Sequence, residues 1–187
     1  MNRTLLVTLL ALSGTTGALT VSGTAGTDGL NRPRVGAWLV SSTGTPLGEL
    51  ASAAITNGTF ALHLPTQAPT GRALWPLTSD HVTWPGVTGH VAVTPNVLAS
   101  ETRLFAYDDT NANGRRDEAE RLVDVTVTNG KASVILVYVD RAADVSAPRG
   151  FNARLSAGWN VLRVELGKTL KVSVATSVAD VQLSLGK

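Results

Sequence analysis

Apolar and polar residues alternate with a period of two along most of the chain, and a sustained helical period is absent. Successive side chains of a strand point to opposite faces, so this alternation is typical of strands with one buried face. Gly, Pro and Asn separate the alternating segments, of which there are about twelve. The pattern predicts an all-β chain and favours an antiparallel β-sandwich. Strands are expected at residues 19–24, 34–40, 51–56, 59–64, 88–94, 102–107, 123–128, 131–136, 151–155, 162–166, 170–174 and 181–185.

Two Asn-Gly pairs predict hairpins, because Asn and Gly accept the positive φ angles of a tight two-residue turn. The first turn is expected at Asn57 and Gly58. This register sets Ile55 opposite Phe60, Ala53 opposite Leu62 and Ala51 opposite Leu64, all on one apolar face. The second turn is expected at Asn129 and Gly130, with Val127 opposite Ala132, Val125 opposite Val134 and Val123 opposite Leu136.

Residues 65–95 interrupt the strand pattern with five prolines and carry Trp75 and Trp84. A long crossing loop or a domain boundary is expected there. We therefore divide the chain into residues 1–18, an N-terminal sandwich-like domain at 19–95 and a C-terminal sandwich domain at 96–187. One continuous sandwich is the alternative.

The N-terminus has the features of a signal peptide. Arg3 precedes an apolar block at residues 4–12, and small residues before Ala18 predict cleavage after that position. The block is about half the length that a spanning helix needs, and no other segment is long and apolar enough, so a chain without membrane spans is expected after cleavage. The predicted location is outside the cytoplasm: periplasmic, cell-surface or extracellular.

Composition narrows the possible functions. The chain has 187 residues and no cysteine, which excludes disulfides and thiolate metal sites. The formal net charge is +2, and Lys and Arg are scattered without aromatic residues between them, which argues against nucleic-acid binding. No catalytic motif is visible, so the chain is not expected to be an enzyme. His63 is expected on a solvated strand face, and Asp80, His81 and His90 lack a convincing third metal ligand.

The segment at residues 109–120 fits the calcium-loop pattern D-x-[DN]-x-[DN]-G-x5-E. Calcium takes six to eight oxygen ligands, and this spacing wraps oxygens around one point. The expected ligands are the side chains of Asp109, Asn111, Asn113, Asp117 and Glu120, together with the backbone carbonyl of Arg115. Gly114 permits the sharp turn at the sixth position.

A simple polar turn is the alternative, since Asn, Asp and Gly are common in turns. It accounts for Asn113 and Gly114 but not for Asp117 and Glu120 at ligand spacing. Three acidic ligands beside Arg115 and Arg116 predict weak calcium binding, with a dissociation constant of about 10⁻⁴ to 10⁻³ M.

Strand patterns on both sides of the loop argue against a helix-loop-helix hand. Over residues 102–128 the segment resembles the calcium loops in the B repeats of bacterial surface adhesins, in which a strand enters the loop and a Val/Thr-rich strand follows. Residues 19–64 resemble the start of a prealbumin-like or carboxypeptidase-regulatory-like sandwich. Both resemblances imply extracellular structural or adhesive modules.

The function expected from the sequence is that of an exported, non-catalytic, calcium-binding β-sandwich protein with a structural or adhesive role at the cell envelope. An envelope protein or a glycan is the expected partner. The alternative is a carbohydrate-binding module that uses Trp75 and Trp84 for stacking, although such residues more often fill the open end of a sandwich.

Overall fold

The computed structural model describes residues 19–186, so the predicted signal peptide at residues 1–18 lies outside the described residues. The fold is all-β, as the alternation predicted. Two short 3₁₀ helices, η1 (Gly71–Ala73) and η2 (Pro148–Gly150), accompany the strands. The strands are β1 (Thr20–Ala25), β2 (Pro33–Val40), β3 (Pro46–Ala54), β4 (Thr59–His63), β5 (Trp75–Pro76), β6 (Ala92–Thr94), β7 (Leu98–Asp108), β8 (Val123–Asn129), β9 (Ala132–Val139), β10 (Ala143–Ala147), β11 (Phe151–Leu155), β12 (Gly158–Glu165), β13 (Lys171–Ala175) and β14 (Ser177–Leu185).

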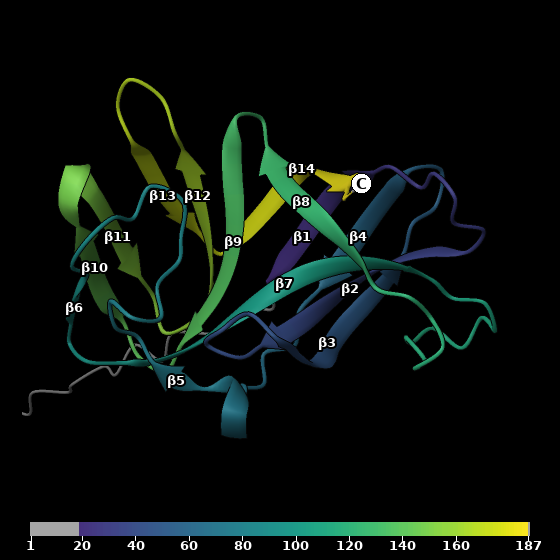
Figure 1. Ribbon diagram of the computed structural model, residues 1–187, viewed down its shortest axis with the longest axis horizontal. Helices are drawn as coiled ribbons and strands as arrows, with labels where there is room; N and C mark the ends of the chain where they lie inside the picture. Colours follow the sequence, from purple (N-terminus) through teal and green to yellow (C-terminus); the bar gives the residue numbers. More distant parts are fainter. Residues whose placement is uncertain (1–18, 187) are drawn as a thin grey trace, which may run out of the picture.

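One large sheet organises the molecule around the long strand β7 (Figure 1). On one edge β7 pairs with β2, which also pairs with β3. On the other edge it pairs first with β9, which leads to β12 and β13, and then with β8, which leads to β14, β1 and β4. The series from β3 through β7 to β4 curves round until β3 and β4 lie side by side, so this half resembles a barrel that is nearly closed.

The antiparallel prediction is wrong for one pair, because β1 and β14 run parallel. The register shifts between Val21 and Gly23, where the two strands approach closely. A Cβ atom built on Gly23 would lie 1.9 Å from the carbonyl oxygen of Val181, so only glycine fits there. The sheet is therefore mixed, and strands from both sides of Pro95 belong to it.

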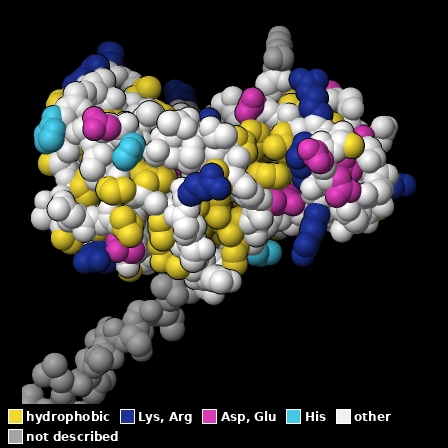
Figure 2. Space-filling view, turned by 60° about the horizontal axis from the view of Figure 1, so that its bottom comes forward, with side chains coloured by type: hydrophobic (Ala, Val, Ile, Leu, Met, Phe, Trp, Pro, Cys, Tyr) yellow, Lys and Arg dark blue, Asp and Glu magenta, His cyan; other side chains and the backbone are white. Residues whose placement is uncertain are grey.

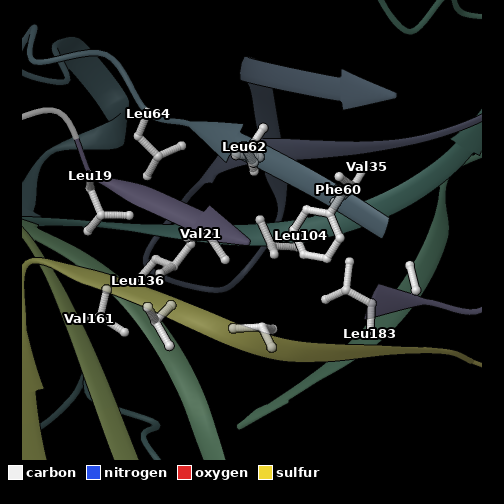
Figure 3. Close-up of a cluster of buried hydrophobic side chains, with 14 of the residues drawn as sticks. Leu19, Val21, Val35, Phe60, Leu62, Leu64, Leu104, Leu136, Val161 and Leu183 are labelled. Carbon is white, nitrogen blue, oxygen red and sulfur yellow. The ribbon is translucent and has the colours of Figure 1, made fainter. Parts of the chain in front are cut away.

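Two buried clusters form the core, one in each half of the molecule. The first fills the barrel-like half with residues such as Val21, Leu62 and Leu104 (Figure 3). The second lies between the branch β9–β12–β13 and a separate three-stranded sheet of β6, β10 and β11, and it contains Phe151 and Leu162. A nearly closed mixed sheet carries most of the strands, and the predicted sandwich is not confirmed. Figure 2 shows apolar side chains reaching the surface between the two halves.

The first hairpin turn is present, but the predicted pairing of its two strands ends after one bridge. Asn57 and Gly58 both have positive φ, at 52° and 72°, as the turn requires. Only Thr56 and Thr59 form a bridge beyond it. β3 then pairs with β2, and β4 pairs with β1. Phe60 and Leu62 still face the core, because the period-two pattern fixes the face and not the partner.

The second hairpin turns one residue later than predicted, at Gly130 and Lys131. Asn129 pairs with Ala132 and Thr128 with Ser133, and pairing between β8 and β9 ends there. The two strands separate because each continues along a different neighbour, β14 for β8 and β12 for β9.

The proline-rich stretch at residues 65–95 is mostly irregular, as predicted. It holds the short strands β5 and β6, whereas a longer strand was expected at residues 88–94. Neither β5 nor β10 was predicted. Trp75 and Trp84 are buried in the second cluster, with 6% and 3% of their surfaces exposed.

Candidate metal site

The loop at residues 109–120 connects β7 to β8 and contains no helix, as the flanking strand patterns predicted. β2 holds the start of this loop in place, because Pro33 pairs with Asp108, the last residue of β7. One further hydrogen bond, from the N–H of Asp109 to the carbonyl of Arg32, holds the first loop residue beside β2 at 3.0 Å. The sheet therefore fixes where the loop begins.

Asp109 anchors the first half of the loop. Its Oδ1 accepts the backbone N–H of Asn113 at 3.0 Å, and its Oδ2 accepts that of Gly114 at 2.9 Å. Gly114 adopts a φ of 80°, which confirms the sharp turn predicted at the sixth position. Only 4% of Asp109 is exposed, and the guanidinium of Arg34 lies 3.7 Å from Oδ2.

Glu120 closes the loop from its other end and is equally buried, at 4% exposed. Its Oε2 accepts the N–H of Asp117 at 2.9 Å, and its Oε1 accepts both the N–H and the hydroxyl of Thr110, at 2.7 and 3.0 Å. These donors favour the ionised carboxylate, so they hold the pKa of Glu120 below its ordinary value. Thr110 is the second residue of the loop and Glu120 the last, so these hydrogen bonds join the two ends of the loop.

The remaining predicted ligands lie between these two carboxylates. Asp117 Oδ2 accepts the side-chain amides of Asn111 and Asn113, at 2.5 and 2.9 Å. The amide oxygen of Asn111 accepts the N–H of Asn113, and that of Asn113 accepts the N–H of Arg115 at 2.8 Å. The five predicted side chains and the backbone of Arg115 thus form one continuous hydrogen-bonded network.

The donor atoms of this loop are of the kind that binds a hard cation. Carboxylate and amide oxygens are the ligands that calcium prefers, and each of the five side chains carries one. Within residues 19–186, however, no group of three or more His, Cys, Asp or Glu side chains converges closely enough to hold a metal. Instead, backbone and side-chain N–H groups donate to the carboxylate oxygens of Asp109, Asp117 and Glu120. Rotation of the amides of Asn111 and Asn113 would turn their oxygens inward.

Two residues of β3 that sequence analysis missed, Ser52 and Glu49, dock the loop on the sheet. Ser52 donates its hydroxyl to the carbonyl of Gly114 at 2.8 Å and accepts from Arg34 at 3.0 Å. Glu49 accepts the hydroxyl of Tyr107 at 3.0 Å and the N–H of Arg116 at 3.2 Å. These partners lie about sixty residues before the loop, so no local spacing could reveal them.

The three histidines do not form a cluster within the described residues. His63 Nδ1 lies 3.0 Å from the hydroxyl of Thr20, and His90 Nδ1 lies 3.2 Å from that of Ser79. His81 instead contacts the carbonyl of Pro76 at 2.9 Å. Each ring therefore has a separate local partner.

Comparisons with family models, curated proteins and solved structures found no match for this chain. Among the described residues, no helix has the length and apolar character needed to cross a membrane.

Proposed function

We propose that this protein is an exported, non-catalytic β protein that binds one calcium ion in the loop at residues 109–120, and that the ion has a structural role. The observation that supports this proposal is the burial of Asp109 and Glu120 at opposite ends of one closed polar loop. Buried carboxylates are costly unless they are hydrogen-bonded or bound to a cation.

The ion would act by fixing the loop against the sheet. Gly114 is hydrogen-bonded to Ser52 of β3, and Arg116 to Glu49 of the same strand. A cation held by Asp109, Asn113 and Glu120 would tighten the turn that presents these groups. The expected result is a firmer connection among β7, β2 and β3.

Weak affinity is part of the proposal. Arg34 lies beside Asp109 and would repel an incoming cation. The oxygens of Glu120 must also exchange N–H donors for the ion. A dissociation constant of about 10⁻⁴ to 10⁻³ M is the range of extracellular calcium modules, and the resemblance of residues 102–128 to adhesin B repeats favours a structural or adhesive role at the cell envelope.

Thermal unfolding tests this function. We expect about 10 mM calcium to raise the melting temperature of the mature chain by about 3 to 10 °C relative to chelator. Asp109→Ala should abolish the rise, whereas Glu118→Ala, at an exposed loop position outside the ligand pattern, should keep it. Equal melting of the wild type in calcium and in chelator would remove the proposal.

We do not propose that Trp75 and Trp84 stack on sugars. Both rings are packed in the second core cluster, and a sugar ring needs an exposed aromatic face to stack on.

A further inference from the structure

β7, β8 and β9 enclose a triangular opening in the main sheet. Beyond the turn, β8 and β9 diverge toward β7, which crosses below them (Figure 1). β9 pairs with β7 only as far as Thr102, and β8 pairs with β7 only from Phe105. Within the described residues, Arg103 and Leu104 of β7 therefore have no ladder partner on this edge. β8 and β9 likewise form no ladder with each other between the turn and their contacts with β7.

A cavity of about 260 Å³ occupies this opening. Its lining includes side chains from both core clusters: Leu104, Val125 and Val134 pack with the first, and Trp84 and Ile135 with the second. The cavity thus extends through the sheet. Its volume is near the lower end of the range for ligand pockets, about 300 Å³, so a small ligand would fill it.

The polar side chains of the cavity are mainly acceptors. Glu101 accepts the indole N–H of Trp84 at 2.6 Å through Oε1, and its second oxygen has no hydrogen bond within residues 19–186. Burial raises the pKa of this carboxyl group above its ordinary value. The hydroxyl of Thr102, which is 5% exposed, has no hydrogen-bond partner among the described residues. Asp124 adds a second carboxylate at an exposed position.

One cation, Arg103, also lines the cavity, and its charge lowers the pKa of Glu101 against the larger, opposite effect of burial. The guanidinium of Arg103 lies against the turn between β2 and β3, where a Cβ on Gly44 would be 3.0 Å from its Nη2. Among residues 19–186, neither Glu101 nor Asp124 forms a salt bridge with Arg103 or with another cation. The rest of the cavity lining is largely aromatic and aliphatic. A ligand that complements this cavity must donate hydrogen bonds, carry positive charge and have an apolar body.

We infer that this cavity binds a small alkylammonium ion. The ammonium group would lie between Glu101 and the aromatic rings of Trp84 and Phe105, and the alkyl chain would contact Val125 and Val134. This inference is independent of calcium, since the cavity and the loop at residues 109–120 share no residue.

Titration of the mature chain with n-pentylammonium in chelator tests the inference, with n-pentanol and n-pentanoate as neutral and anionic controls of similar size. Two-dimensional ¹H–¹⁵N NMR would follow the indole N–H of Trp84 and the amides of Arg103 and Val134. We expect saturable shifts at these positions with the ammonium compound alone, with a dissociation constant on the order of millimolar.

Glu101→Gln should lower the affinity by about tenfold or more, because it removes the charge while keeping an acceptor for Trp84. Asp124→Asn, at an exposed position, should lower it by a smaller factor, and Glu118→Gln in the distant loop should leave it unchanged. Equal binding of n-pentanol, unchanged affinity in both Glu101→Gln and Asp124→Asn, or no shift at the three reporter positions would overturn the inference.

Discussion

Glu101 and Glu120 are both associated with β7, yet their environments are opposite. Glu120 lies in the loop after the strand, where backbone N–H groups surround its two oxygens and lower its pKa. Glu101 lies within the strand beside the triangular opening, where burial raises its pKa and the indole of Trp84 is its hydrogen-bond donor. The two carboxyl groups therefore have pKa values shifted in opposite directions, that of Glu101 mainly by burial and that of Glu120 mainly by hydrogen-bond donors.

The two regions also differ in what a cation would encounter. In the loop, a cation must displace N–H donors that already satisfy Asp109 and Glu120. At the opening, a cation would meet the second oxygen of Glu101, which accepts no hydrogen bond from the residues that the structure describes. We propose calcium for the first region because several oxygens lie along one short loop, and an organic cation for the second because its walls are apolar.

The largest effect is expected for Asp109→Ala, measured in chelator. The substitution removes two hydrogen bonds to the carboxylate, from the N–H groups of Asn113 and Gly114, and a hydrogen bond to a charged group contributes about 1.5–3 kcal/mol. We therefore expect urea unfolding to show a loss of about 2–4 kcal/mol. Glu118→Ala is the matched control and should change stability by less than about 0.5 kcal/mol. If the two variants were equally stable, the hydrogen-bonded loop would contribute nothing to the ion-free protein.

The pH dependence of stability should separate the two glutamates. The lowered pKa of Glu120 means that its stabilising contribution is complete above the ordinary glutamate pKa and is lost as the pH falls toward the lowered value. Glu120→Gln should therefore destabilise the protein near neutral pH, with a difference that shrinks in acid.

Glu101→Gln should behave in the opposite way. Between the ordinary and the raised pKa the folded protein binds a proton that the unfolded chain does not, so the wild type loses stability as the pH rises through this window. The glutamine variant avoids that loss and should be the more stable protein near neutral pH, with no advantage below about pH 4. Urea unfolding from about pH 4 to about pH 8 measures both differences. Parallel profiles for the two variants would contradict the assigned environments.

The smallest effect is expected for Ser52→Ala, which removes the hydrogen bond that docks Gly114 on β3. One such bond contributes about 1 kcal/mol. In chelator, the free energy of unfolding should therefore fall by about 1 kcal/mol. Calcium should stabilise the variant less than it stabilises the wild type, because this hydrogen bond between the loop and β3 is lost. Ser42→Ala, at a half-buried serine in the turn between β2 and β3, is the control. A calcium response identical to that of the wild type would show that docking and ion binding are not coupled.

The sequence predicted features that depend on neighbouring residues. It placed the Asn57–Gly58 turn, most strand segments and the inward faces of Phe60 and Leu62, because these follow from local conformation and period-two burial. It also placed Gly114 at a positive φ within a loop between two strands.

Features that depend on distant residues were not predicted. The parallel pairing of β1 with β14 joins strands about 160 residues apart, and the opening exists because β8 and β9 each follow another neighbour. Alternation along one strand contains no information about its partner. For the same reason Glu49 and Ser52, which dock the loop, and Glu101, which lines the opening, could not be recognised from their sequence context.

Calorimetric titration of the protein with calcium tests the central claim most directly. We expect one ion per chain with a dissociation constant of about 10⁻⁴ to 10⁻³ M. Binding should be lost in Asp109→Ala and in Glu120→Gln and retained in Glu118→Gln. An absence of saturable heat in the wild type up to about 10 mM calcium, or equal binding by Asp109→Ala, would contradict the account.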